Sequence, residues 1–125
     1  MNSELAIREY DLDGGITVKL RDVTRHYFGG YYHVRIEVGA DVPLSAPAFA
    51  DPEEYRAALR LLGEQIRFHR VLEKMAVPEA DIAAARQGLL DAFDTNMLPY
   101  LSRPDFPERF MHSEYARCLK SSLRR

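Results

Sequence analysis

The feature that most constrains this chain is the stretch from Ile16 to Val38, ITVKLRDVTRHYFGGYYHVRIEV. Its two flanks are rich in Val, Ile, Thr and Tyr, the residues that favour β-strands. The Gly29-Gly30 pair between them can take the positive φ angles that a two-residue hairpin turn requires. The stretch therefore predicts two long antiparallel strands joined by a tight turn, with the downstream chain covering one face.

A second hairpin is predicted directly before this one. Residues 4–12 form a strand candidate, and Asp13-Gly14-Gly15 follows as a three-residue loop. The loop length predicts a register that places the apolar residues of both strands on one face, with Leu12 opposite Ile16 and Tyr10 opposite Val18.

The strand after this loop changes its hydrophobic phase. Its apolar positions are even from Ile16 to Leu20 and odd at Val23 and Tyr27. An inserted residue reverses the alternation of a strand, so a β-bulge near Arg21-Asp22 would restore one continuous apolar face.

A two-residue turn at Gly29-Gly30 also predicts which residues face each other across the hairpin. The expected pairs are Phe28 with Tyr31, Tyr27 with Tyr32, and His26 with His33. The strand that follows the turn then presents its even residues, from Tyr32 to Val38, to the core. The opposite side is expected to carry His33, Arg35 and Glu37 together with Asp22, Thr24 and His26.

The rest of the chain predicts a loop, three helices and a further strand. Residues 39–52 are turn-rich because they contain three prolines, and we expect them to pack on the sheet. A helix then starts at Pro52 with Asp51 as its cap and stops at Gly63. A strand is then expected over 64–74, and the alternative for this segment is a continuation of the helix. Two further helices are expected, over 79–98 with its end at Pro99 and over 106–121.

These elements predict an α+β fold in the order β-β-β-α-β-α-α, with helices on one face of an antiparallel meander of three or four strands. At 125 residues the chain is expected to form one domain, 1–125. Its net charge of −2 disfavours general attraction to nucleic acid. No stretch reaches the ~20 apolar residues of a membrane span, and the charged N-terminus is unlike a signal peptide. A cytoplasmic protein without membrane association is expected.

Two segments, LPYLSRPDFPERF at 98–110 and the Asp13-Gly14-Gly15 hairpin, resemble small uncharacterised bacterial proteins of unknown function. Because no activity is assigned to that family, the resemblance implies no functional residue and no cofactor.

The predicted pair of His26 and His33 is a candidate metal site. Opposed positions on antiparallel strands bring Cβ atoms to about 5 Å, which allows two imidazoles to bind one transition metal. Asp22 and Glu37 would supply oxygen ligands from the same face. The alternative is that both histidines are solvated residues beside an exposed turn.

A second candidate is a ligand-binding face formed by the basic and aromatic residues of the same hairpin. Its expected members are Arg25, Arg35, Tyr27 and Tyr31, with Lys19 and Arg21 nearby. Aromatic side chains on a sheet beside arginines are typical of surfaces that bind single-stranded nucleic acid. An ordinary solvated sheet face is the alternative.

Catalytic motifs are not found, and Cys118 lies on an apolar helical stripe that favours a packed thiol.

A sheet edge and two apolar stretches, Tyr31-Tyr32 and Ala46–Phe49, favour self-association. A homodimer through the sheet edge or the C-terminal helix is therefore expected. The sequence therefore predicts a binding or protein-interaction module without enzymatic activity and without a cofactor. A metal- or small-ligand-dependent activity at His26 and His33, or nucleic-acid binding on residues 17–36, are the alternatives.

Overall fold

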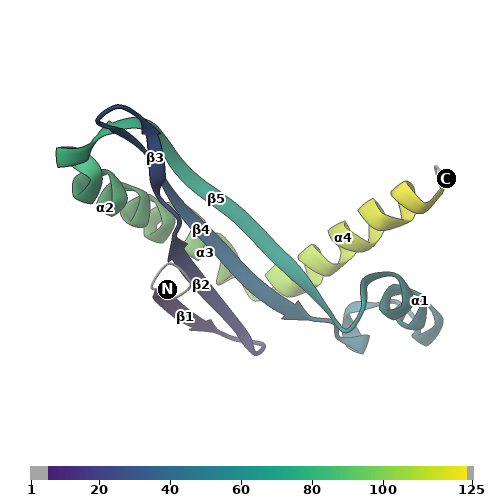
Figure 1. Ribbon diagram of the computed structural model, residues 1–125. Helices are drawn as coiled ribbons and strands as arrows, with labels where there is room; N and C mark the ends of the chain where they lie inside the picture. Colours follow the sequence, from purple (N-terminus) through teal and green to yellow (C-terminus); the bar gives the residue numbers. More distant parts are fainter. Residues whose placement is uncertain (1–5, 124–125) are drawn as a thin grey trace.

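The computed structural model describes residues 6–123 and has an α+β fold built on an open antiparallel sheet (Figure 1). The central strand, β4, pairs with β2 and β3 along one edge and with β5 along the other, and β1 pairs with β2. The strands are β1 (Ala6–Leu12), β2 (Ile16–Asp22), β3 (Arg25–Phe28), β4 (Tyr31–Pro43) and β5 (Gln65–Pro78). The predicted fold class and antiparallel sheet are confirmed.

The helices pack on one side of this sheet. They are α1 (Pro52–Leu62), α2 (Ile82–Ala92), α3 (Leu98–Leu101) and α4 (Phe106–Leu123), with short 3₁₀ turns η2 (Ala46–Ala48) and η3 (Glu79–Asp81) and a π-helical turn η4 (Phe93–Met97). Figure 1 shows α1 and the last turns of α4 reaching past the end of the sheet.

The first hairpin has the predicted register. Leu12 pairs with Ile16 and Tyr10 pairs with Val18, and the apolar side chains of β2 are buried. The strand is observed from Ala6, and residues 4 and 5 of the predicted strand lie outside the described residues.

The predicted bulge at Arg21-Asp22 is wrong. Asp22 pairs with Ile36 and Arg25 pairs with His33, so the register is the same before and after the break between β2 and β3. Within the break, the Val23 N–H donates to the carbonyl oxygen of Arg35 at 2.9 Å, which continues the ladder.

The insertion is found instead at Tyr27. Phe28 pairs with Tyr31 as predicted, but His26 pairs with Tyr32 rather than His33. The ladder from β2 and the turn at the tip impose registers that differ by one residue, so one residue must be left without a partner. The predicted pairs of Tyr27 with Tyr32 and His26 with His33 are therefore wrong.

Two faces of the sheet follow from this register. The helix-covered face carries the even residues of β2 and β4 and forms the core. Its largest fully buried members include Ile36, Val38 and Val42, with Phe68 from β5. The other face, which we call the open face, carries the odd residues of the same strands, among them His33, Arg35 and Glu37 as predicted.

The core is closed by aromatic side chains from α4. The Phe68 ring lies 5.6 Å from Phe106 and 5.5 Å from Phe110, both in edge-to-face contact. Burial of one such ring contributes about 1.5–3 kcal/mol, so this contact holds α4 against β5.

Several predicted boundaries differ from those observed. Strand β4 continues through Gly39 to Pro43, because β5 pairs with it over that whole length. Strand β5 runs on to Pro78, which extends the predicted strand 64–74 and excludes the helical alternative. The stretch Ala46–Phe49 is expected to be an apolar surface for self-association within a loop that packs on the sheet, and its Ala48 and Phe49 are buried in the core.

The predicted stop at Pro99 is also wrong. Helical backbone continues through the π-helical turn η4 into α3, where Pro99 is the second residue. Pro99 lies in the first turn of α3, the part of a helix in which a proline is tolerated.

Candidate functional site

The most unusual surface of the protein is the end of the sheet at the turn between β3 and β4. Phe28 is 75% exposed, Tyr27 54%, Met75 50% and Tyr31 47%. Phe28 and Tyr31 are paired across the hairpin, and Met75 comes from β5, which touches β3 at this end. We call these four residues the aromatic tip. Large apolar side chains gathered on a surface are typical of interaction sites.

Backbone contacts hold the aromatic tip in place. The Glu79 N–H, at the end of β5, donates to the carbonyl oxygen of Gly30 at 3.1 Å. The Tyr32 hydroxyl donates to the Glu79 carboxylate at 3.2 Å, and this hydrogen bond raises the pKa of the Tyr32 phenol. The turn between β3 and β4 is therefore hydrogen-bonded to the end of β5.

The two histidines of the predicted metal site point to different faces. Residues paired across antiparallel strands share a face, so His26 lies with Tyr32 on the helix-covered side, where the two rings are 5.3 Å apart. His33 lies with Arg25 on the open face. The Nε2 of His26 is 2.6 Å from the carbonyl oxygen of Gly29.

The two predicted oxygen ligands are separated in the same way. Asp22 reaches the α2 residue Arg86 at 2.6 Å, whereas Glu37 lies on the open face beside Arg21. Residues 6–123 contain no group of three His, Cys, Asp or Glu side chains placed to hold a metal ion. The expected metal site thus has no geometric support.

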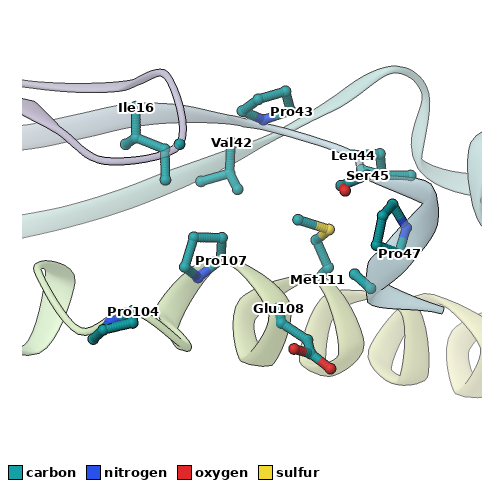
Figure 2. Close-up of a pocket in the computed structure, with 12 residues that line it drawn as sticks. Ile16, Val42, Pro43, Leu44, Ser45, Pro47, Pro104, Pro107, Glu108 and Met111 are labelled. Carbon is teal, nitrogen blue, oxygen red and sulfur yellow. The ribbon is translucent and has the colours of Figure 1, made fainter.

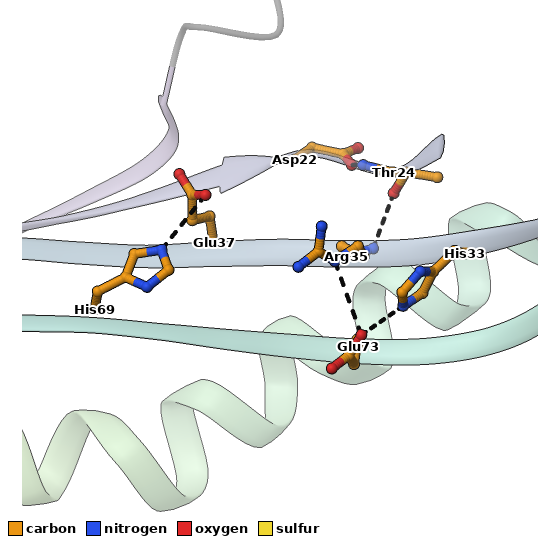
Figure 3. A network of polar contacts seen from close by, with 7 residues as sticks. All are labelled: Asp22, Thr24, His33, Arg35, Glu37, His69 and Glu73. Atoms are coloured by element: carbon orange, nitrogen blue, oxygen red, sulfur yellow. Dashed lines mark hydrogen bonds and ion pairs between the residues drawn. The ribbon is translucent and has the colours of Figure 1, made fainter. Parts of the chain in front are cut away.

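The open face carries a chain of ion pairs instead (Figure 3). The Nε2 of His33 lies 2.5 Å from Oε1 of Glu73, and the guanidinium of Arg35 is 3.8 Å from the same oxygen. His33 is only 7% exposed. None of the hydrogen bonds among the described residues joins a histidine to a hydroxyl or thiol, so these contacts orient side chains without forming a nucleophile–base pair.

The cations expected to bind nucleic acid are mostly neutralised. Lys19 lies 3.7 Å from Glu9, Arg21 3.8 Å from Glu37, and Arg35 3.8 Å from Glu73. Arg25 is the member of this set for which the described part of the chain offers no ion-pair partner. A surface with alternating charge does not attract a phosphate backbone strongly, so this geometry does not support the nucleic-acid alternative.

A polar hollow of about 460 Å³ lies on the open face between β2, β4 and β5. Its floor is Gly39, over which Arg67 lies so closely that a Cβ atom on Gly39 would be 2.1 Å from the Arg67 Nη2. The guanidinium of Arg67 is 3.4 Å from Asp41. The Arg67 side chain, already paired with Asp41, therefore lies over the floor of the hollow.

A compact polar cluster joins the first strand to η4. The Asp94 carboxylate accepts a hydrogen bond of 2.7 Å from the Tyr10 hydroxyl and one of 2.8 Å from Arg8. The Tyr10 hydroxyl, followed by the Arg8 guanidinium, holds the pKa of Asp94 below its ordinary value. Burial and then the hydrogen bond to Asp94 raise the pKa of Tyr10. The cluster fixes the edge strand to the helical layer.

An apolar cavity of about 310 Å³ opens at the opposite end of β4 (Figure 2). Ile16 and Val42 point into it from the sheet, and Met111 points into it from α4. Four of the seven prolines of the chain also line it: Pro43, Pro47, Pro104 and Pro107. We call it the proline pocket. Glu108 is an exposed member of its lining whose carboxylate points away from Ile16 and Val42. Proline rings give the pocket rigid walls.

The four ligand-binding residues predicted from the sequence lie at or near the β3–β4 end of the sheet. Tyr27 and Tyr31 belong to the aromatic tip, Arg25 is exposed beside it, and Arg35 is held in the open-face ion pairs. Met75 and the proline pocket were missed, because their neighbours are distant in sequence. The clustered prolines of 43–47 and 104–107 are the signal that could have indicated the pocket.

No helix among residues 6–123 is long and apolar enough to cross a membrane. No protein-family model, curated protein or solved structure matches the chain.

Proposed function

We propose that this protein is an interaction module that associates with further copies of itself through the aromatic tip, and that it has no enzymatic activity. The observation that carries the proposal is the exposure of Phe28, which at 75% is far beyond what folding requires of a phenylalanine. Aromatic residues of this kind supply the largest share of binding energy at protein interfaces.

Two further features support the proposal. The tip is held by the hydrogen bond between Glu79 and Gly30, so binding would order little additional chain. On the open face His33 is buried against Glu73 and the exposed His69 lies 3.4 Å from Glu37, so the ion pairs leave no concentrated charge there as a competing site.

The proposal is tested by replacing Phe28 and Tyr31 together with serine and measuring mass by sedimentation velocity over a range of concentrations. We expect the wild type to associate and the double variant to remain monomeric. Thermal stability should change little, because exposed surface positions contribute within about 0.5 kcal/mol.

The matched control is Leu123→Ser, at an apolar residue that is 83% exposed on α4. This variant should associate like the wild type. A monomeric wild type would overturn the proposal, and loss of association in the Leu123 variant alone would assign the interface to the C-terminal helix.

A further inference from the structure

We propose that the proline pocket of one copy is the receptor for the aromatic tip of another. This inference rests on the proposed function and adds the surface to which the tip binds. It follows from three properties of the two surfaces: their position, their chemistry and their charge.

The tip and the pocket lie at opposite ends of one strand. β4 begins at Tyr31, in the tip, and ends at Pro43, in the wall of the pocket. At roughly 3.3 Å per residue these ends are about 40 Å apart. A tip therefore cannot reach the pocket of its own chain, and the contact must join two molecules.

The chemistry of the two surfaces is complementary. The tip presents aromatic rings, whereas the pocket presents proline rings above an apolar floor that includes Ile16, Val42 and Met111. Recognition of proline by aromatic side chains is common in peptide-binding domains. The rigid pyrrolidine rings preform the pocket, so insertion of a side chain costs little ordering entropy.

The charges around the two surfaces are opposite. Arg25 shares the open face with Phe28, since their partners His33 and Tyr31 are two residues apart on β4. Glu108 is an exposed residue of the pocket lining, with its carboxylate directed outward from α4. Neither Arg25 nor Glu108 takes part in an ion pair within residues 6–123. Docking of the tip would bring a free cation to a free carboxylate.

Each copy carries one tip and one pocket, so the contact joins two different surfaces. Such a contact closes into a pair or ring if the geometry permits and otherwise continues as a chain. In either case, one molecule with an intact tip and a second molecule with an intact pocket can form one contact.

The test is a complementation experiment on the full chain. The tip variant carries Phe28→Ser and Tyr31→Ser. The pocket variant carries Ser45→Trp. Ser45 is an exposed residue of the pocket lining, with extended backbone and no side-chain cap hydrogen bond. A large side chain at this position can therefore enter the pocket without altering the core. Each variant alone should be monomeric by sedimentation velocity. Their equimolar mixture should form a heterodimer and nothing larger, because only one working tip and one working pocket remain.

A second measurement exchanges the charges. Arg25→Glu and Glu108→Arg should each weaken association several-fold, and the chain that carries both should regain it. Self-association of the pocket variant at wild-type strength, or failure of the double charge variant to recover, would overturn the receptor assignment while leaving association through the tip intact. A small molecule retained in the pocket by native mass spectrometry, with association unaffected by Ser45→Trp, would assign the pocket to a ligand instead.

Discussion

The unpaired residue Tyr27 determines which side chains of this hairpin share a face. The β2–β4 ladder and the Gly29-Gly30 turn each impose a register on β3, and Tyr27 absorbs the difference between them. As a result His26 and His33 point to opposite faces and Tyr27 becomes part of the exposed tip. The hydrophobic pattern places the bulge too early, because the apolar phase changes at Val23 whereas the register of the ladder continues unchanged to His26.

Gly63 and Gly39 differ in whether the backbone requires glycine. Gly63 ends α1 with φ 86° and ψ −171°, a conformation that is essentially restricted to glycine. Gly63→Ala should therefore lower the free energy of unfolding by about 1–3 kcal/mol. Gly39 has ordinary backbone angles, and a Cβ there meets only the flexible end of Arg67. Gly39→Ala should be close to neutral, because the guanidinium can move away.

Urea unfolding of both variants measures this difference. The same stability loss at both positions would mean that space, rather than backbone conformation, limits both glycines.

Asp94 is the residue from which pH dependence is expected. Its pKa in the folded protein is lowered by Tyr10 and then by Arg8, so the ionised carboxylate stabilises the fold. That contribution is complete above the ordinary aspartate pKa of about 3.9 and is lost as the pH falls through the lowered value. Asp94→Asn should be less stable than the wild type at neutral pH, and the gap should shrink on acidification below about pH 4.

The measurement is thermal unfolding of both proteins at neutral and acidic pH. Because the two proteins differ only at position 94, contributions from the rest of the chain largely cancel in the comparison. A gap that stays constant with pH would show that Asp94 acts through shape rather than charge.

At the scale of single elements, β5 is distinguished by Ala76, which has a positive φ of 53°. It lies where the β4–β5 register shifts, and the left-handed conformation costs a non-glycine residue about 1–2 kcal/mol. Ala76→Gly should remove this strain at an entropic cost of about 0.5–1 kcal/mol, for a net gain between zero and about 1.5 kcal/mol.

The matched control is Ala84→Gly in α2, an exposed helical position where the same substitution should destabilise by about 1 kcal/mol. Chemical denaturation of the two variants should give shifts of opposite sign. Destabilisation by both would show that the β5 strand does not store strain at Ala76.

The boundaries of the helical segments also depend on contacts with distant parts of the chain. The predicted helix 79–98 is divided into η3, α2 and η4 and then continues as α3. The Asp94 contact with Arg8 and Tyr10 lies within the π-helical turn, so a strand from the other end of the chain holds the segment where the helical pattern changes. A local reading of apolar spacing cannot detect such a contact.

Across the whole molecule, the two ends of β4 have different surfaces. One end has exposed aromatic rings and Arg25, and the other has a proline-lined cavity and Glu108. The helices cover one face of the intervening sheet, and paired charges cover the other. This polarity is the basis for the proposed contact between unlike surfaces, in place of the sheet-edge dimer expected from the sequence.

The local elements follow from the amino-acid sequence alone. They are the two hairpins at Asp13-Gly14-Gly15 and Gly29-Gly30, the Asp51 cap of α1, and the alternation that buries the even residues of β4. These depend on backbone preferences and on side chains a few residues apart. Four other features are set by tertiary contacts: the position of the bulge, the face of each histidine, the length of β5, and the cavity between the end of the sheet and α4. Each of these depends on a balance between contacts from distant segments, which no single stretch of the chain contains.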